Sequence, residues 1–177
     1  MSGFGGQGIL LMGQLLCYAG MQEGLQVTWM PSYGPEMRGG TANCTVMLSP
    51  ERVGSPVTRY PTSLVAMNKA SLDKFEEALK PGGLLVVNSS LVARDPRRSD
   101  LRTIRVPANK IAEEAGTLQV TNMAALGAYV ASRKIVALES VLVALRRMIP
   151  EHRRDLLAAN QEALRKGAEA VGNRNRI

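Results

Sequence analysis

The sequence is poor in cysteine, histidine and aromatic residues, and these shortages exclude several kinds of site. Only two cysteines and one histidine occur among its 177 residues. An iron–sulfur cluster needs about four thiolates, and a structural zinc site needs a comparable set of Cys and His ligands. The chain therefore cannot hold either group by itself. Aromatic residues make up only 4% of the sequence, which argues against a stacking surface for single-stranded nucleic acid.

Long apolar runs are also missing. The sequence contains no run of about 18 apolar residues and no signal-peptide pattern, so we expect no membrane-spanning segment and no membrane partner. The sparse cysteines suit a reducing compartment. We therefore predict a cytoplasmic protein.

The net charge of +7 is unevenly distributed. Residues 94–105 hold five arginines against two aspartates, and residues 133–177 hold ten basic against five acidic side chains. A basic tail can indicate a nucleic-acid-binding protein. Here the charges of both signs are interleaved, as on a solvated helix surface, and no nucleic-acid-binding motif accompanies them. We expect a solvated or subunit-facing surface and no nucleic-acid partner.

The composition is that of a folded α/β protein. With 45% hydrophobic and 21% charged residues, the chain suits one compact domain that needs no disulfide or metal to hold its core. Short apolar runs alternate with longer helical stretches, which is typical of the α/β class. We predict a three-layer Rossmann-like open sheet, mostly parallel, with C-terminal helices packed on it. We expect a single domain over residues 1–177, with an α/β core in 1–121 and a helical part in 122–177.

Local patterns place the individual elements. Ser71 is expected to be the N-cap of a helix that ends before Pro81, and residues 31–35 are expected to form an irregular loop. The expected strands are 25–30, 44–48, 64–67, 84–87 and 104–106, and the expected helices are 9–21, 71–79, 108–115, 123–132, 138–147 and 155–169.

The clearest local motif is G-F-G-G-Q-G at residues 3–8, which runs directly into the first expected helix. Glycines let backbone N–H groups approach an anion, and the N-terminus of a helix adds a favourable dipole. The spacing fits G-x-G-x-x-G, but Pro31 and Ser32 stand where an NAD site has an acidic residue, and no G-K-[ST] is present. An NAD site is therefore disfavoured and an ATP-binding P-loop excluded. A tight turn without a ligand is the alternative interpretation.

A second cluster, P-S-Y-G-P-E-M-R-G-G-T-A-N at residues 31–43, connects two expected strands. In an open α/β sheet, ligands bind outside the carboxyl ends of the strands. Arg38 could clamp a phosphate or carboxylate with two hydrogen bonds. The alternative is a surface loop with an internal ion pair between Glu36 and Arg38.

Four asparagines are candidates for polar roles in the interior. Asn68 and Asn88 each end an expected strand, where they could line a crevice or satisfy the backbone of a turn. Asn122 and Asn160 are expected to be helix caps or buried hydrogen-bonding residues.

The sequence offers no catalytic constellation. Cys17 and Cys44 are expected to be structural, and His152 has no catalytic partner in its charged surroundings. No Ser/His/Asp set, Cys/His set or carboxylate pair is found. We predict that the chain binds something anionic and depends on other subunits for catalysis.

Five segments in order along nearly the whole chain carry a family resemblance. They are G-F-G-G-Q-G at 3–8, the motif at 31–43, P-G-G-L-L-V-V-N-S-S-L at 81–91, N-M-A-A-L-G-A-Y at 122–129 and N-Q-E-A-L-R-K-G at 160–167. Together they resemble the gamma subunit of 2-oxoacid:ferredoxin oxidoreductases. The 31–43 motif, with A-M-N-K-A-S-L-D-K-F at 66–75, is most similar to the 2-oxoglutarate branch.

The resemblance implies a reaction and a set of partners. A 2-oxoacid is decarboxylated oxidatively with coenzyme A to give an acyl-CoA and CO₂, and ferredoxin accepts the electrons. Thiamine diphosphate and iron–sulfur clusters would lie on partner subunits only, namely alpha, a thiamine-diphosphate-binding beta and a ferredoxin-like delta subunit. This chain would contribute to assembly and to the coenzyme A side of the active site, with no catalytic residue of its own.

The resemblance also suggests which residues would contact coenzyme A. Its pyrophosphate and 3′-phosphate suit a glycine loop at a helix N-terminus together with an arginine. Residues 5–8 would contact the phosphates, and Tyr33, Glu36 and Arg38 would shape the neighbouring crevice or a subunit contact. The full set of candidates is Gly3, Gly5, Gly6, Gln7, Gly8, Ser32, Tyr33, Gly34, Glu36, Arg38, Gly39, Asn68 and Asn88.

The resemblance further implies an apolar strand immediately before the glycine motif. Only Met1 and Ser2 precede that motif here, so we expect that the sequence begins late and that the sheet loses a central strand. Other functions remain open: a gamma subunit for pyruvate or a branched-chain 2-oxoacid, a stand-alone coenzyme A- or nucleotide-binding protein, or an assembly subunit with an empty glycine loop.

Overall fold

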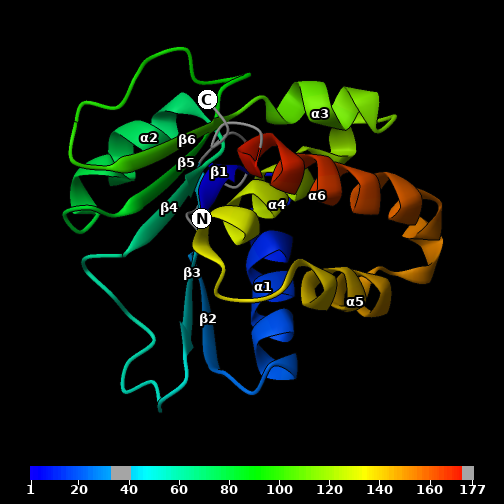
Figure 1. Cartoon of the computed structure of the whole chain (residues 1–177), viewed down its shortest axis with the longest axis horizontal. Helices are drawn as coiled ribbons and strands as arrows, with labels where there is room; N and C mark the ends of the chain where they lie inside the picture. The colour runs from blue at the N-terminus through cyan, green and yellow to red at the C-terminus, as the bar shows by residue number, and fades with distance from the viewer. Residues whose placement is uncertain (33–40, 173–177) are drawn as a thin grey trace.

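The computed structural model describes residues 1–32 and 41–172. Within them, six strands form one sheet in the order β2-β3-β1-β4-β5-β6, and helices lie on both of its faces (Figure 1). The strands are β1 (Ser2–Phe4), β2 (Gln26–Ser32), β3 (Thr41–Ser49), β4 (Ser63–Ala66), β5 (Leu84–Asn88) and β6 (Arg102–Val106). The α-helices are α1 (Ile9–Gln22), α2 (Lys69–Phe75), α3 (Ala108–Glu114), α4 (Thr121–Arg133), α5 (Leu138–Met148) and α6 (Leu157–Gly172), and the 3-10 helices are η1 (Glu76–Ala78), η2 (Leu118–Val120) and η3 (Glu151–Leu156).

The sheet is mixed but mostly parallel. β1 pairs in parallel with β4, β4 with β5, and β5 with β6, whereas β3 is antiparallel to both β1 and β2. Among the strands of the described residues, β3 alone is therefore antiparallel to all the others. The predicted α/β class and mostly parallel sheet are confirmed.

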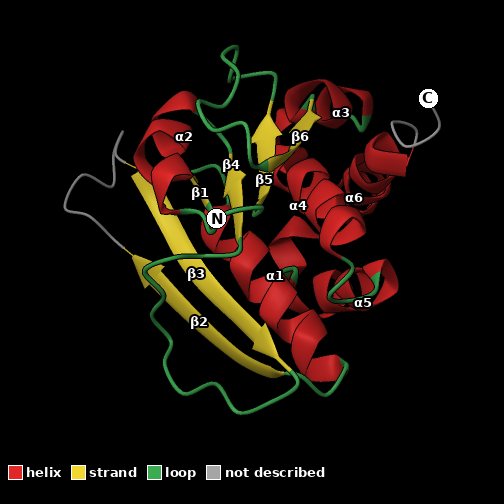
Figure 2. Ribbon diagram, turned by 60° about the vertical axis from the view of Figure 1, so that its left-hand side comes forward, coloured by secondary structure: helices red, strands yellow, loops and turns green. Residues whose placement is uncertain are grey.

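Two clusters of buried apolar side chains cover the two faces of the sheet. Along β5, Leu84 and Val86 belong to the larger cluster, which includes residues of α1, α4 and α6. Leu85 and Val87 point the other way, into the cluster that includes Leu72 of α2, because successive side chains of a strand alternate between faces. Figure 2 shows α2 on one side of the sheet and α1, α4 and α6 on the other. The predicted three layers are confirmed. No helix of the described ranges is long and apolar enough to cross a membrane.

Several element ends differ from those expected. β2 continues through Pro31 and Ser32, where we expected an irregular loop. Proline is tolerated there because β2 is an edge strand and pairs only with β3. The N-cap of α2 is Asn68, whose Oδ1 accepts the N–H of Ser71 at 2.8 Å. The expectation that Ser71 caps this helix is therefore wrong.

A short central strand, β1, consists of Ser2 and the first two residues of the glycine motif, contrary to the expectation that the sheet loses a central strand. Ser2 pairs with Asn43 of β3 and with Ala66 of β4. Its carbonyl oxygen accepts the N–H of Met67 at 2.9 Å. The side-chain hydroxyl of Ser2 lies 2.9 Å from that of Ser71. These bonds anchor the start of the glycine motif to both neighbouring strands.

α4 and α6 pack so closely that two positions require glycine. A Cβ atom on Gly127 would overlap the carbonyl oxygen of Leu164, and one on Gly167 would overlap that of Ala124. Because both obstacles are backbone atoms of well-packed helices, they cannot yield without moving a helix. The close approach leaves α4 buried along nearly its whole length.

Replacing Gly127 tests this packing. We expect Gly127→Ala to lower the free energy of unfolding by about 2 kcal/mol or more, as for other overpacked cores. Gly172→Ala is a matched control, because it lies in α6 and no atom lies within 4 Å of its Cβ position. It should be neutral, or stabilising by up to about 1 kcal/mol. Urea unfolding followed by circular dichroism measures both variants, and equal losses would contradict the close helix approach.

The buried carboxylate of Glu76 holds the segment after β5 against η1. Its side chain is 1% exposed and forms an ion pair with Arg94 at 2.8 Å. It also accepts the backbone N–H groups of Arg97 and Arg98. Burial raises the pKa of Glu76, but the hydrogen bonds from Arg94 and the two N–H groups outweigh burial and hold the pKa below its usual value.

Glu76→Gln should therefore destabilise the protein in a pH-dependent manner. Removing one partner of a buried ion pair costs about 3 kcal/mol. We therefore expect the substitution to lower the free energy of unfolding by this amount at pH 7. Because the folded pKa is depressed, the stabilisation is present above the unfolded pKa of about 4.3 and is lost as pH falls through the folded pKa. Urea titrations of both proteins at pH 7 and near pH 4 should show the difference shrinking. A difference that stays constant with pH would rule out the carboxylate charge as the anchor.

Candidate functional site

The carboxyl ends of the neighbouring parallel strands β1 and β4 lie at the middle of the sheet. After β1 the chain turns to α1 on one face, and after β4 it turns to α2 on the other face (Figure 2). Where neighbouring parallel strands connect to opposite faces, their carboxyl ends leave a crevice, and open α/β sheets bind ligands there. The glycine loop, residues 5–8, follows β1, and Asn68 follows β4, so both lie at this switch point.

The glycine loop turns tightly because two of its residues have positive φ. Gly6 has φ 90° and Gly8 has φ 68°, a region that glycine enters without strain. The N–H of Gln7 donates to the carbonyl oxygen of Phe4 at 3.2 Å. The side-chain Oε1 of Gln7 accepts the N–H of Phe4 at 2.7 Å. Gly3 is buried within β1, whereas Gly5 and Gly6 are exposed, so the tip of the loop is open to solvent.

The first turn of α1 leaves hydrogen-bond donors at this tip. Gly8 precedes the helix without a side-chain cap, and the first turn contains no acidic residue. Within residues 1–32 and 41–172, the N–H groups of Gly6, Gly8 and Ile9 have no acceptor. Such N–H groups, together with the dipole of a helix, favour a bound anion.

Asn122 supports the glycine loop from α4. The side chain is buried, its Nδ2 donates to the carbonyl oxygen of Gly8 at 3.3 Å, and its Oδ1 accepts the N–H of Met123 at 3.0 Å. A Cβ atom on Gly8 would overlap the amide of Asn122. The expected buried hydrogen-bonding role is confirmed. Asn122 lies 114 positions from Gly8 in the sequence, so no local sequence pattern indicates this contact.

Buried amides continue from the glycine loop to the ends of β4 and β5. Nδ2 of Asn68 lies 3.4 Å from Oε1 of Gln7. Nδ2 of Asn88 donates to the carbonyl oxygen of Met67 at 3.4 Å and to Oδ1 of Asn109 at 2.9 Å. Asn68 accepts the N–H of Ser71 and Asn88 accepts the N–H of Ser90, so both satisfy turn or cap backbone. Their second expected role, lining a crevice, stays a prediction. We did not predict Asn109; its position just after the last expected strand is the only sequence signal for it.

The other candidates lie farther away or outside the described part of the chain. Ser32 ends β2 in register with Asn43 of β3, which in turn pairs with Ser2 of β1. Ser32 is therefore at the same edge of the sheet but two strands from the glycine loop, and among the described residues no hydrogen bond joins them. Outside the described residues lie Tyr33, Gly34, Glu36, Arg38 and Gly39.

The described residues offer no metal ligands or activated nucleophile. No group of three or more His, Cys, Asp or Glu in these ranges could hold a metal ion. Cys17 and Cys44 are buried, and burial raises the pKa of Cys17 to about 12 and also raises that of Cys44. Both remain protonated near neutral pH, so their predicted structural role is confirmed. His152 is exposed.

Comparison with known proteins assigns the chain to a family. Residues 1–170 match the sequence model described as "Pyruvate ferredoxin/flavodoxin oxidoreductase", and the chain belongs to this family. It is 46% identical over 131 residues to ketoisovalerate oxidoreductase subunit VorA of Methanothermobacter marburgensis. This alignment covers 74% of this chain and 27% of that protein. The chain thus spans about a quarter of the length of this curated relative. It is 33% identical over 157 residues to 2-oxoglutarate synthase subunit KorC of the same organism, covering 85% of this chain and 84% of that protein.

A solved structure narrows the assignment within the family. The gamma subunit of a keto/oxoacid ferredoxin oxidoreductase from Geobacter sulfurreducens PCA superposes with a TM-score of 0.83 at 32% identity. The match covers 97% of this chain and 96% of that one. The chain is therefore a gamma-type member of the family, as the sequence motifs predicted.

Proposed function

We propose that the chain works as the gamma subunit of a heteromeric 2-oxoacid:ferredoxin oxidoreductase. The complex would convert a 2-oxoacid and coenzyme A into acyl-CoA and CO₂ and pass the electrons to ferredoxin. The family match over residues 1–170 and the near-complete overlap with a solved gamma subunit support this proposal. Thiamine diphosphate and the iron–sulfur clusters would belong to alpha, beta and delta partners. This division of labour agrees with the small number of cysteines in the sequence.

The chain's own contribution would be to bind the phosphates of coenzyme A at the glycine loop. The observation that carries this proposal is the set of N–H groups of Gly6, Gly8 and Ile9, in the glycine loop and at the start of α1, which have no acceptor in the described residues. A pyrophosphate has the charge and the oxygen acceptors that such a site prefers. The side chains of Gln7 and Asn68 meet beside the loop, where they would order it around the ligand. Arg38 remains a candidate for a further phosphate contact.

Two glycines at opposite ends of α1 provide a matched test. Gly6 has φ 90° and Gly24 has φ 78°, and both have open space around a Cβ position. Alanine at either site costs about 1–2 kcal/mol of backbone strain. We expect Gly6→Ala in the purified complex to raise the KM for coenzyme A about tenfold, equivalent to about 1.4 kcal/mol, with little change in the KM for the 2-oxoacid. Gly24→Ala should leave both constants near their wild-type values.

Steady-state assays of ferredoxin reduction distinguish the outcomes. An unchanged KM for coenzyme A in Gly6→Ala, or an equal rise in both variants, would contradict the placement of coenzyme A phosphate on this loop. The subunit assignment would survive that result, because it rests on the family match rather than on the loop.

For the 2-oxoacid we infer 2-oxoglutarate, on the basis of the 31–43 motif and the similarity to KorC over 85% of this chain. A branched-chain 2-oxoacid is the second candidate, because the identity to the ketoisovalerate subunit VorA reaches 46%. We expect kcat/KM of the purified complex to be about tenfold or more higher for 2-oxoglutarate than for ketoisovalerate or pyruvate, in line with the discrimination that differences in side-chain chemistry permit. A preference for either competitor would transfer the complex to that branch of the family.

A further inference from the structure

A small hollow lies at the amino ends of β4, β5 and β6, away from the carboxyl ends where the glycine loop stands. Its volume is about 260 Å³. The register of the sheet brings its walls together, because Ser63, Leu84 and Arg102 pair side by side near the starts of the three strands. Its lining contains three cationic side chains, those of Lys80, Arg102 and Arg133, and no acidic one.

Backbone hydrogen bonds fix the wall that carries Lys80. The N–H of Lys80 donates to the carbonyl oxygen of Pro61 at 2.9 Å, and the N–H of Leu84 donates to that of Thr62 at 3.0 Å. A Cβ atom on Gly83 would lie only 2.8 Å from the carbonyl oxygen of Lys80. The turn before β5 therefore packs tightly against the start of β4, and the position of Lys80 is set by the fold.

The two arginines of the hollow are brought together by β6 and α4. The backbone N–H of Arg102 donates to the carbonyl oxygen of Gly83 at 3.0 Å, which holds the start of β6 beside the turn. Nη1 of Arg102 donates to the carbonyl oxygen of Ser132 at 3.4 Å. Arg133 follows Ser132 as the last residue of α4. A guanidinium has five N–H donors, so this one bond leaves Arg102 free to bind an anion.

The three cations have no carboxylate partner in the part of the chain that the structure describes. None of its ion pairs includes them. Asp100 reaches the turn, where it accepts the N–H of Gly82 at 3.3 Å, but its two oxygens already bind Arg98 at 2.9 and 2.6 Å. Like charges that gather without a counter-charge repel one another, and a bound anion would remove this repulsion.

We propose that this hollow binds a phosphate group, either as free phosphate or as a small phosphate monoester. A phosphate carries a charge of about −1.5 to −2 near neutral pH, and guanidinium groups match its oxygens with two parallel hydrogen bonds each. The hollow is smaller than the roughly 300–1,000 Å³ of sites for drug-sized ligands, so the ligand is small. This site lies at the other end of the sheet from the glycine loop and does not rest on the coenzyme A proposal.

A residue-resolved titration tests the proposal on the full chain. Inorganic phosphate is added to ¹⁵N-labelled protein while sodium chloride keeps the ionic strength constant. We expect the amide signals of Gly82, Gly83 and Arg102 to shift saturably, because these groups belong to the hollow. The signals of Gly6 and Gly8 report on the glycine loop, so phosphate bound there cannot be mistaken for phosphate bound in the hollow.

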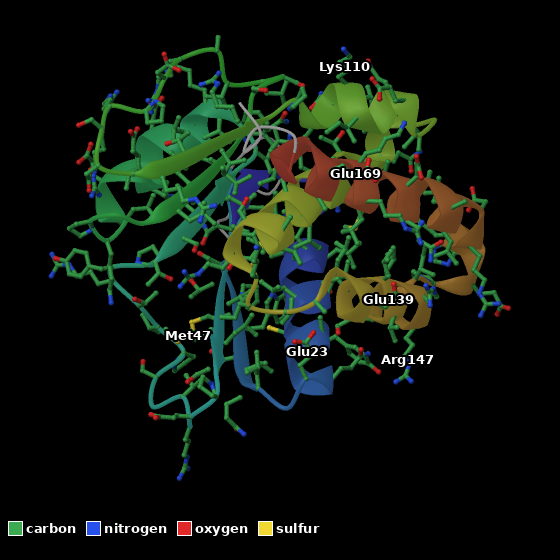
Figure 3. All side chains as sticks on the ribbon, in the orientation of Figure 1. Glu23, Met47, Lys110, Glu139, Arg147 and Glu169 are labelled. Atoms are coloured by element: carbon green, nitrogen blue, oxygen red, sulfur yellow. The ribbon has the colours of Figure 1, made fainter. Side chains whose placement is uncertain are left out.

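Three single substitutions of exposed cations provide the matched comparison. Lys80→Gln and Arg133→Gln should each weaken the phosphate affinity read at the hollow about fivefold or more, because each removes one of its charges. Lys110→Gln should change it by less than about twofold. Lys110 is exposed on α3, which follows the carboxyl end of β6 (Figure 3). Far-UV circular dichroism establishes that all three variants are folded.

Glycerol phosphate distinguishes the two sources of the phosphate group. Binding as tight as that of inorganic phosphate, or tighter, identifies a monoester as the ligand, and weaker binding identifies the free ion. Shifts at Gly82 and Gly83 that do not saturate would overturn the proposal. Equal affinities in the wild type and in folded Lys80→Gln and Arg133→Gln, or an equal loss in Lys110→Gln, would overturn it as well.

Discussion

The architecture depends on β1 lying between an antiparallel and a parallel neighbour. Three residues in this position connect the β2–β3 hairpin to the β4–β5–β6 sheet, because Ser2 pairs with β3 on one side and β4 on the other. The connections after β1 and β4 lead to α1 and α2 on opposite faces of the sheet (Figure 2). The glycine loop therefore lies at a topological switch point, where open α/β sheets bind ligands.

Side-chain amides hold the glycine loop and its neighbours; those of Asn68 and Asn122 are buried and that of Gln7 is partly buried. Gln7, Asn68 and Asn122 each make their hydrogen bonds to loop or cap backbone or to one another. A buried amide that is fully bonded costs little and orients its neighbours, whereas an unbonded one would be expensive. These uncharged amides lie beside N–H groups that have no acceptor in the described residues. This arrangement suits a subunit that holds a phosphate-bearing substrate while partners carry out the chemistry.

The sequence predicted the elements whose signals are local. β4 and β5 are short apolar runs bounded by turn residues, and α1 follows directly from the glycine motif. The N-cap of α2 was misplaced because Asn68 and Ser71 are both good capping residues three positions apart. The ends of β2 and β3 were underestimated because pairing between the two strands extends them past their apolar cores. The contacts of Asn122 with Gly8 and of Asn88 with Asn109 join distant segments, so no local pattern could reveal them.

The most direct test of the account is whether the chain works as one subunit among several. Affinity purification of the tagged chain from native extract, followed by mass spectrometry, identifies what it binds. The account predicts recovery of a thiamine-diphosphate-binding subunit and a cluster-bearing subunit, in a complex that reduces ferredoxin with a 2-oxoacid and coenzyme A. Recovery of the chain alone, as a monomer that binds coenzyme A without partners, would contradict it.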